Sequence, residues 1–417
     1  MTLRNRFTLV GLGMVIFLII TPALILYARG FQIDWQNWGL VKTGAMVVRT
    51  QPTKAEIFLN DKKHKSTTPA NLRFLLPGDY NIRLEKEKYQ SWTKRLSVKS
   101  QLVTWANFNR DYLTLFLTKP DQTQNLQIKA STISKTGNEI IFLSPDRLGR
   151  INVNNGSDLT LINTNNLNLP ILSSTVEIVW NNAQEVFNLF ADKSTLNTLE
   201  SQLPKIQHLE TEGSHGVALI ASDLYFIQAN GLALLDKTVS NFTLSNDGIW
   251  YIQKNTVKHY DFSNNKSEVI FTQLPASTQN KVIRTSNQIY LILDGTLYLF
   301  NGALEKIYSP VTQTFWDENS GQLLYSNEHE IYSYQPNTKD STLILRSLTP
   351  ISSPVLNKET GYVFYQNEGK IKAIELDGRD HRNIFTIADA LNNFSLSKDG
   401  KKLYTISRTE IKIYQIR

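Results

Sequence analysis

The chain of 417 residues contains no cysteine. This absence excludes disulfide bonds, thiolate metal ligands and cysteine nucleophiles. Histidine is also scarce: there are six, and no two of them are spaced as in an HExxH zinc motif. A G-x-S-x-G nucleophile elbow is missing as well. The sequence therefore argues against the commonest hydrolase and metalloenzyme classes, and we expect no cofactor and no metal.

Charge is sparse and unevenly distributed. Charged residues make up 19% of the chain and hydrophobic residues 41%, as in folded globular domains. Residues 42–118 hold 14 basic and 6 acidic residues, a net charge of +8, whereas the whole chain carries only +7. The basic character thus belongs to one small segment. The length predicts two or three domains.

One long apolar run stands near the N-terminus. Residues 7–28 are 22 residues without a charge. As a helix they would span roughly 30 Å, the thickness of the hydrocarbon core of a bilayer. The alternatives are a buried core helix and a cleaved signal peptide, whose apolar region runs only about 7–15 residues. We expect an uncleaved transmembrane anchor over residues 1–28, followed by a juxtamembrane linker over 29–42.

The flanking charges predict the orientation of this anchor. Arg4 and Arg6 precede the apolar run, and only Arg29 closely follows it. The positive-inside rule then places the N-terminus in the cytoplasm and the bulk of the chain outside it, at the cell membrane. Aromatic residues that could form an outer interfacial belt follow the run: Tyr27, Phe31, Trp35 and Trp38.

Residues 43–118 read as a small β-domain. Apolar and polar residues alternate in short runs, as expected of half-buried strands: 45–50, 55–60, 80–87, 93–99 and 112–117. Turn-forming residues separate these runs, including Pro52, an AspLysLys turn at 61–63 and Pro77-Gly78. The pattern predicts a small antiparallel sandwich.

Several residues of this segment carry a family resemblance. Pro52-Thr-Lys-Ala55 precedes a predicted strand, ThrProAla at 68–70 opens a loop, and LeuProGly at 76–78 precedes the next strand. In this order the motifs resemble a PEGA domain. Lys54 and Lys88 stand where the family usually has glycine, which concerns turn geometry rather than chemistry. The resemblance implies a β-sandwich and no catalytic residues.

The LysLysHisLys run at 62–65 is the most distinctive polar feature of this domain. Its three lysines, Lys62, Lys63 and Lys65, have two interpretations. They are solvated residues at a loop tip, or they bind an anionic surface such as wall polymer or lipid headgroups. Most such runs are solvated loop tips, whereas the local net charge of +8 suits the second interpretation.

Internal repeats dominate residues 119–417. Three segments share a Ser-x-Asp/Thr-Gly turn that runs into an apolar strand: 134–143, 245–252 and 397–406. Similar turns are centred near residues 136, 182, 216, 247, 286, 319, 359 and 399. A spacing of about 30 to 46 residues is typical of four-stranded propeller blades. We therefore predict a seven- or eight-bladed β-propeller over 119–417, which makes the chain all-β apart from its N-terminal helix.

Two segments make this region similar to TolB-like and WD40-like propellers: 375–385 and 395–403. The resemblance implies binding of proteins or peptides, although some such propellers hydrolyse or cleave polysaccharides. The last repeat contains only three recognisable strands before Arg417. A ring of blades leaves no exposed edge only if its ends join. We therefore expect residues 122–129 to supply the missing outermost strand.

Two functions remain open at this point. The favoured one is a non-enzymatic envelope protein that binds an unidentified protein or glycan through its propeller, with no nucleic acid involved. The alternative is a propeller hydrolase or lyase acting on a wall polysaccharide or peptide. Two carboxylates with a His or Arg in the central channel would favour the alternative. The candidates for such a cluster are Asp294, Asp317, Asp377, Asp380, His329 and His381.

Overall fold

The computed structural model divides the chain into two compact units. Unit 1 contains residues 1–119 together with 374–385 and 416–417, and unit 2 contains residues 120–373 and 386–415. The structure describes the following residues: 3–34, 38–108, 110–120, 122–125, 130–133, 139–143, 147–152, 158–163, 206–212, 215–228, 231–285, 288–317, 321–389, 393–397, 400–406 and 410–416.

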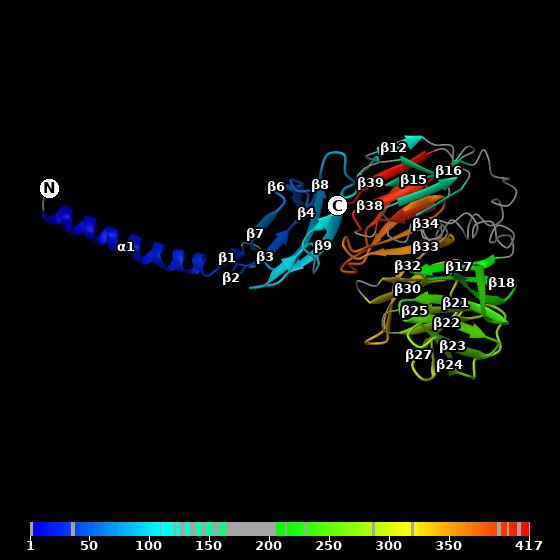
Figure 1. The fold of residues 1–417 in the computed structure, drawn as a ribbon. Helices are drawn as coiled ribbons and strands as arrows, with labels where there is room; N and C mark the ends of the chain where they lie inside the picture. The colour runs from blue at the N-terminus through cyan, green and yellow to red at the C-terminus, as the bar shows by residue number, and fades with distance from the viewer. Residues whose placement is uncertain are drawn as a thin grey trace. The chain divides into compact units, whose positions relative to one another are not determined.

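Unit 1 begins with one long helix, α1 (Leu3–Ala28), drawn in blue in Figure 1. Its stretch Gly11–Ala28 has a mean hydropathy of 2.3, and none of that stretch is buried in the protein. The helix is therefore long and apolar enough to cross a membrane, as an anchor or a signal sequence would be. A short hairpin follows, formed by β1 (Phe31–Asp34) and β2 (Gly39–Lys42).

Two sheets form the body of unit 1. One is antiparallel and has the strand order β6 (Lys62–Thr67), β5 (Glu56–Leu59), β8 (Gly78–Glu85), β9 (Trp92–Val98). The other has the order β10 (Val103–Trp105), β3 (Gly44–Val48), β7 (Ala70–Leu75). The side chains buried by the two sheets include Met46, Val48, Ile57, Leu72, Ile82, Leu84, Trp92 and Leu96.

The sandwich differs from the prediction in strand direction. β10 runs parallel to β3, and β11 (Leu113–Thr114) runs parallel to β4 (Thr50–Gln51). Both parallel pairs join strands about 60 residues apart in the sequence, so no hairpin turn signals them. The strictly antiparallel arrangement that we expected is therefore wrong for these two pairs.

Turn geometry explains two features of the sequence. The predicted turn at 61–63 lies one residue earlier, because Asn60 and Asp61 take φ of +48° and +62° and Lys62 already begins β6. Two positive φ values are those of the type I′ turn that short hairpins favour. Lys54 and Lys88, where glycine is usual in the PEGA family, also have positive φ, +63° and +70°. Glycine adopts this conformation without steric cost.

Unit 2 is built from four-stranded sheets. In six of them the strands pair in sequence order. Their bounds are β13 (Ala130–Ile133), β14 (Glu139–Leu143), β15 (Arg147–Asn152), β16 (Asp158–Asn163); β17 (Ile206–Glu212), β18 (His215–Ile220), β19 (Asp223–Gln228), β20 (Gly231–Asp236); β21 (Val239–Ser245), β22 (Gly248–Gln253), β23 (Thr256–Asp261), β24 (Lys266–Phe271); β25 (Asn280–Arg284), β26 (Ile289–Leu293), β27 (Thr296–Phe300), β28 (Leu304–Tyr308); β29 (Gln313–Asp317), β30 (Gln322–Ser326), β31 (Glu330–Gln335), β32 (Asp340–Arg346); β33 (Ile351–Asn357), β34 (Tyr362–Asn367), β35 (Lys370–Glu375), β36 (Ile384–Asp389).

The seventh sheet joins the two ends of this region. Its order is β12 (Gln122–Asn125), β39 (Glu410–Gln415), β38 (Lys402–Ile406), β37 (Asn393–Leu396). β12 runs antiparallel to β39, with Gln122 opposite Ile413 and Asn125 opposite Glu410. The predicted pairing of 122–129 with the last repeat is confirmed for residues 122–125. Residues 126–129 lie outside the described part of the chain.

Neighbouring sheets of unit 2 share apolar cores. Val217 and Leu224 of one sheet pack with Phe242 and Ile249 of the next. Trp250, Ile252 and Val257 pack in the same way with Val282, Leu291 and Leu293. Face-to-face packing of successive four-stranded sheets is the arrangement of propeller blades.

The predicted turn positions have mixed outcomes. Those near 247 and 359 are turns, whereas 216 lies within β18. Those near 136, 182, 286, 319 and 399 lie outside the described residues. Beyond residue 119 the described residues form seven four-stranded sheets, and 164–205 are not among them. Seven versus eight blades therefore stays a prediction.

Candidate functional site

The three candidate lysines lie on β6, an edge strand of the four-stranded sheet of unit 1. All three side chains are exposed. Side chains alternate along a strand, so Lys63 and Lys65 point to one face and Lys62 to the other. Lys63 Nζ lies 2.6 Å from Glu56 Oε1, and both side chains are about half exposed. The lysines therefore belong to a strand rather than a loop tip, and they do not form one continuous patch.

This position gives the lysines a structural role beside any binding role. An edge strand exposes backbone N–H and C=O groups that could pair with another chain. Lysine on such an edge discourages pairing, because a partner strand would have to desolvate or approach the charges. Protection of the sheet edge thus accounts for Lys62, Lys63 and Lys65 without any ligand.

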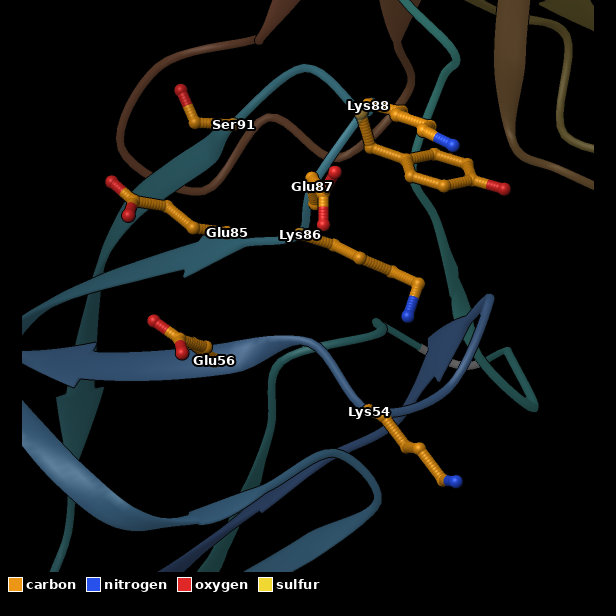
Figure 2. Close-up of a pocket in the computed structure, with 8 residues that line it drawn as sticks. Lys54, Glu56, Glu85, Lys86, Glu87, Lys88 and Ser91 are labelled. Atoms are coloured by element: carbon orange, nitrogen blue, oxygen red, sulfur yellow. The ribbon is translucent and has the colours of Figure 1, made fainter.

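An open groove of about 850 Å³ lies at one end of the same sheet. It is lined by Lys54, Glu56, Glu85, Lys86, Glu87, Lys88, Tyr89 and Ser91. Figure 2 shows the amino groups of Lys54 and Lys86 on one side and the carboxylates of Glu56 and Glu85 on the other. Glu56 and Glu85 face each other in register, and Arg83 pairs with Glu85 at 3.1 Å. The groove carries both signs of charge, and two of its glutamates, Glu56 and Glu85, already have cationic partners.

The opposite edge of this sheet, β9, contains a buried lysine. The Lys94 side chain is fully buried, and its Nζ lies 2.8 Å from Glu375 Oε2 and 3.2 Å from Asp377 Oδ2. The same Nζ donates to the backbone oxygen of Asp377 at 2.9 Å. Two hydrogen bonds and a second ion pair thus compensate the buried charge of Lys94. Glu375 is the last residue of β35 and Asp377 lies in the connection to β36, and residues 374–385 belong to unit 1.

The two carboxylates are held by further donors. Trp92 Nε1 donates to Glu375 Oε1 at 3.2 Å. Arg379 binds Asp377 through Nε and Nη2, in the two-pronged geometry that a guanidinium offers a carboxylate. We call these five residues, Trp92, Lys94, Glu375, Asp377 and Arg379, the Lys94 cluster. Since each of its carboxylates is bound to charged and polar donors, the cluster is built to hold structure and not to react.

The connection also covers the backbone of β9. Asp380 Oδ2 accepts a hydrogen bond from Arg95 N at 3.0 Å, and Asn383 Nδ2 donates to Thr93 O at 3.0 Å. Phe385 packs on Phe116, with ring centroids 5.3 Å apart. Backbone groups of an edge strand that would otherwise face water or another strand are thereby occupied.

These contacts change the acidity of two carboxyls. Burial alone would raise the pKa of Asp377, but hydrogen bonds from Arg379 and the charge of Lys94 outweigh it, so the pKa is lowered. The pKa of Asp380 is lowered mainly by the hydrogen bond from Arg95 N and then by His381. Both carboxylates are therefore ionised at neutral pH.

The candidate channel carboxylates have local structural roles where the structure describes their partners. Asp377 and Asp380 bind unit 1 residues, as described above. Asp294 lies in the β26–β27 turn and accepts hydrogen bonds from Thr278 and Gln279. These hydrogen bonds, the Gln279 one foremost, lower its pKa.

Asp317 is buried at the end of β29. His329 lies in the β30–β31 turn, where its backbone N–H donates to Asn327 Oδ1. In the part of the chain that the structure describes, no three His, Asp or Glu side chains are grouped to hold a metal ion.

The Lys94 cluster was not predicted from the sequence. Lys94 was part of a predicted strand, and 375–385 was read only as a propeller segment. The available signal was weak: a lysine at an inward-facing position of an alternating strand, between Trp92 and Leu96, implies a buried charge that needs a distant acid. Nothing in the sequence tells which acid that is.

Comparison with known proteins supports the sandwich assignment. Residues 43–111 match the model of the PEGA domain. No relative was found among the curated proteins. Among solved structures, a chain of the mitotic checkpoint complex is similar at 11% identity and a TM-score of 0.43, covering 72% of this chain and 93% of that one. The extracellular domain of a protein described as a hybrid two-component system from B. thetaiotaomicron is similar at 12% identity and a TM-score of 0.42. That match covers 72% of this chain and 40% of the other.

Proposed function

We propose that this protein is a single-pass membrane protein of the cell envelope that binds a protein or glycan without catalysis. In this proposal α1 crosses the membrane with its N-terminus in the cytoplasm, and units 1 and 2 lie outside. The PEGA-like domain sits next to the membrane, and its Lys63 and Lys65 contact anionic wall polymer. The sheets of unit 2 form a closed β-propeller whose face receives the partner.

The packing of the end of α1 against the β-sandwich of unit 1 is the observation that carries this proposal. Thr43 N donates to Gly30 O at 2.8 Å, directly after the helix. The ring of Tyr27, in the last turn of α1, stacks on Phe74 of β7 with centroids 4.9 Å apart. A removable signal sequence would take Tyr27 with it and leave Phe74 without its stacking partner. The helix end is thus packed as part of the unit, as an anchor would be.

The propeller rests on the strand pairing of the seventh sheet. The β12–β39 pair brings the first strand of unit 2 to the last. The neighbouring sheets from β17 to β32 share apolar cores. Ring closure by a strand from the opposite end of the sequence pairs the edge of β39 that would otherwise be open. The hydrolase or lyase alternative has less support, because Asp294, Asp377 and Asp380 are engaged in turns and in the Lys94 cluster.

The absence of cysteine allows a clean test of topology. Single cysteines are introduced at Thr2, at Ser100 in unit 1 and at Ala276 in unit 2, and intact cells or spheroplasts are treated with a membrane-impermeant maleimide. The proposal predicts labelling of S100C and A276C, and labelling of T2C only after the membrane is permeabilised. Labelling of T2C in intact cells, or protection of A276C in spheroplasts, contradicts it.

A further inference from the structure

Apolar side chains are exposed at the end of unit 1 that adjoins α1. Trp38, in the β1–β2 turn, is 81% exposed, and the cross-strand pair Ile33 and Leu40 is 50% exposed at each residue. At the start of β10, Leu102 is 56% exposed and Val103 is 52% exposed. We call these five residues the apolar rim.

Hydrogen bonds tie the rim to the end of the helix. Thr43 N and Oγ1 both donate to Gly30 O at 2.8 Å. Gln101 N in turn donates to Thr43 O at 2.9 Å, and Leu102 follows Gln101. Gly30, Thr43 and Gln101 are thus neighbours across two hydrogen-bonded backbone spacings, which together amount to about 10 Å. Leu102 therefore lies close to the point where α1 leaves the apolar stretch that ends at Ala28.

Positive charges surround the rim. Lys42 Nζ lies 3.2 Å from Gln101 Oε1 and 5.4 Å from the centre of the Phe31 ring. Arg73, next to the Phe74 that stacks on Tyr27, is exposed, and so are Arg29 and Lys99. An apolar surface ringed by lysine and arginine matches the boundary between acyl chains and anionic headgroups.

We propose that the apolar rim is a lipid-contacting surface that inserts into the headgroup region of the outer leaflet. Lys42, Arg73 and Lys99 contact lipid phosphates there, and Trp38 takes the interfacial position that tryptophan prefers. The inference rests on the proposed anchoring by α1, which brings the rim to the bilayer. A bilayer is the occupant favoured by this continuity, because the rim follows the apolar helix within a few residues and carries the complementary charge.

Depth-dependent quenching in proteoliposomes tests the inference on the full chain. Single cysteines at Leu102, Leu18 and Glu87 carry an environment-sensitive fluorophore, and the lipids carry a nitroxide either at the headgroup or in mid-chain. Glu87 is the matched control: it is exposed in the same domain, beyond the far end of β8, at least about 23 Å of strand away from the rim. We expect the headgroup nitroxide to quench L102C several-fold more strongly than E87C. The difference should be larger with phosphatidylglycerol than with phosphatidylcholine alone.

The helix position separates failure of this inference from failure of the proposed function. If mid-chain nitroxide quenches L18C but neither nitroxide quenches L102C, the anchor stands and the lipid-contacting rim is wrong. If L18C is not quenched either, the proposed anchoring is wrong. Shielding of L102C that depends on protein density and not on the lipid nitroxide would assign the rim to a second copy of the chain and overturn the inference.

Discussion

Both edge strands of the four-stranded sheet in unit 1 carry lysine. The lysines are exposed on one edge, and a lysine is buried on the other. On β6, Lys62, Lys63 and Lys65 stay in water and keep the edge open but charged. On β9, Lys94 points inward and is fully buried against Glu375 and Asp377, while Asp380 and Asn383 occupy the backbone of the edge. Exposed lysine charges protect the β6 edge from pairing with another strand, whereas residues 375–385 cover the β9 edge.

The comparison shows that the contribution of a lysine to the stability of a strand depends on whether its side chain is exposed or buried. An exposed lysine contributes little to the free energy of unfolding, because water solvates its charge in both the folded and the unfolded state. A buried lysine is tolerated only where its three protons meet acceptors, and removal of one partner leaves an uncompensated charge. Lys94 can be buried, unlike the lysines of β6, because residues 375–383 supply its partners. These residues lie about 280 positions after Lys94 along the chain.

The largest effect should come from Lys94→Met, which keeps the length of the side chain and removes its charge. Two buried carboxylates then lose their shared cation, and breaking a buried ion pair in this way costs about 3–5 kcal/mol. Hydrogen exchange of the β9 amides, measured by mass spectrometry, should show this loss of local stability. Arg95→Met is the matched control on the neighbouring exposed position and should cost under about 0.5 kcal/mol.

A second variant sharpens this result. Lys94→Met combined with Glu375→Gln removes both charges, leaves an amide oxygen for Trp92 Nε1 and leaves Asp377 with Arg379. The double variant should recover much of the lost protection, since a neutral buried pair carries no uncompensated charge. Equal exchange in the single variant and the wild type would show that the Lys94 cluster does not hold the edge.

In the seventh sheet, β12 pairs with β39 and covers its edge. A disulfide bond can link these two strands covalently. Thr123 lies opposite Lys412, so cysteines at these two positions should form a disulfide readily on mild oxidation. A disulfide that closes so long a loop should stabilise unit 2 by about 2–4 kcal/mol, seen as a raised midpoint of thermal unfolding. Thr123→Cys with Glu410→Cys, two positions out of register, is the control and should remain largely reduced. Equal oxidation of both pairs would contradict the register.

Acid should open the covered edge of β9 before it affects the charged edge of β6. The pKa values of Asp377 and Asp380 are lowered in the folded protein, relative to about 3.9 in an unfolded chain. Their contribution to stability is therefore complete above that unfolded value and is lost as the pH falls below about 4 through the folded pKa values. Limited proteolysis between residues 375 and 385 should accelerate over that range. Asp380→Asn should be cut faster at neutral pH and show a weaker pH dependence.

The smallest effect on stability should come from the charged edge itself. Lys63→Ala with Lys65→Ala removes one exposed ion pair with Glu56 and should change the free energy of unfolding by at most about 1 kcal/mol. If these lysines bind anionic surfaces, binding of the full chain to anionic wall polymer should weaken and become less sensitive to salt. If they only protect the edge, binding stays the same and aggregation on concentration increases. Lys306→Ala with Lys281→Ala, exposed lysines of unit 2, is the control for loss of charge alone.

Local patterns in the sequence predicted much of the fold. Alternation around Ile82 and Leu84, the Pro77-Gly78 break and the Ser-x-Asp-Gly turn that opens 245–252 are short-range signals, and the strands they predicted are present. The pairing of 122–125 with β39 followed from a count of strands in the last repeat. In contrast, the expectation of purely antiparallel pairing was wrong for β10–β3 and β11–β4, because these parallel pairs join strands far apart in the sequence. The turn expected near 216 was wrong as well, since residue 216 lies within β18.

The candidate site was predicted less well, because its contacts also join residues that are far apart in the sequence. Lys62, Lys63 and Lys65 stood out because they are adjacent in sequence, yet on a strand they point to both faces. The Lys94 cluster joins residues from 92–94 and 375–379, and its strength comes from burial, which no local pattern reports. The apolar rim was partly visible in Trp38, which belongs to the predicted aromatic belt, whereas Leu102 and Val103 join the rim only through backbone pairing with Ala45. Trp35 lies outside the described residues.

The assembly of unit 1 from two distant stretches of chain also sets an order of events during synthesis. When Lys94 leaves the ribosome, the acids that will neutralise it are about 280 residues from being made. At about 5–20 residues per second the interval is roughly 15 to 55 seconds. Throughout that time the inward face of β9 is incomplete, while α1 is already available for membrane insertion. The small domain nearest the N-terminus is thus among the first parts to be made and among the last to finish folding.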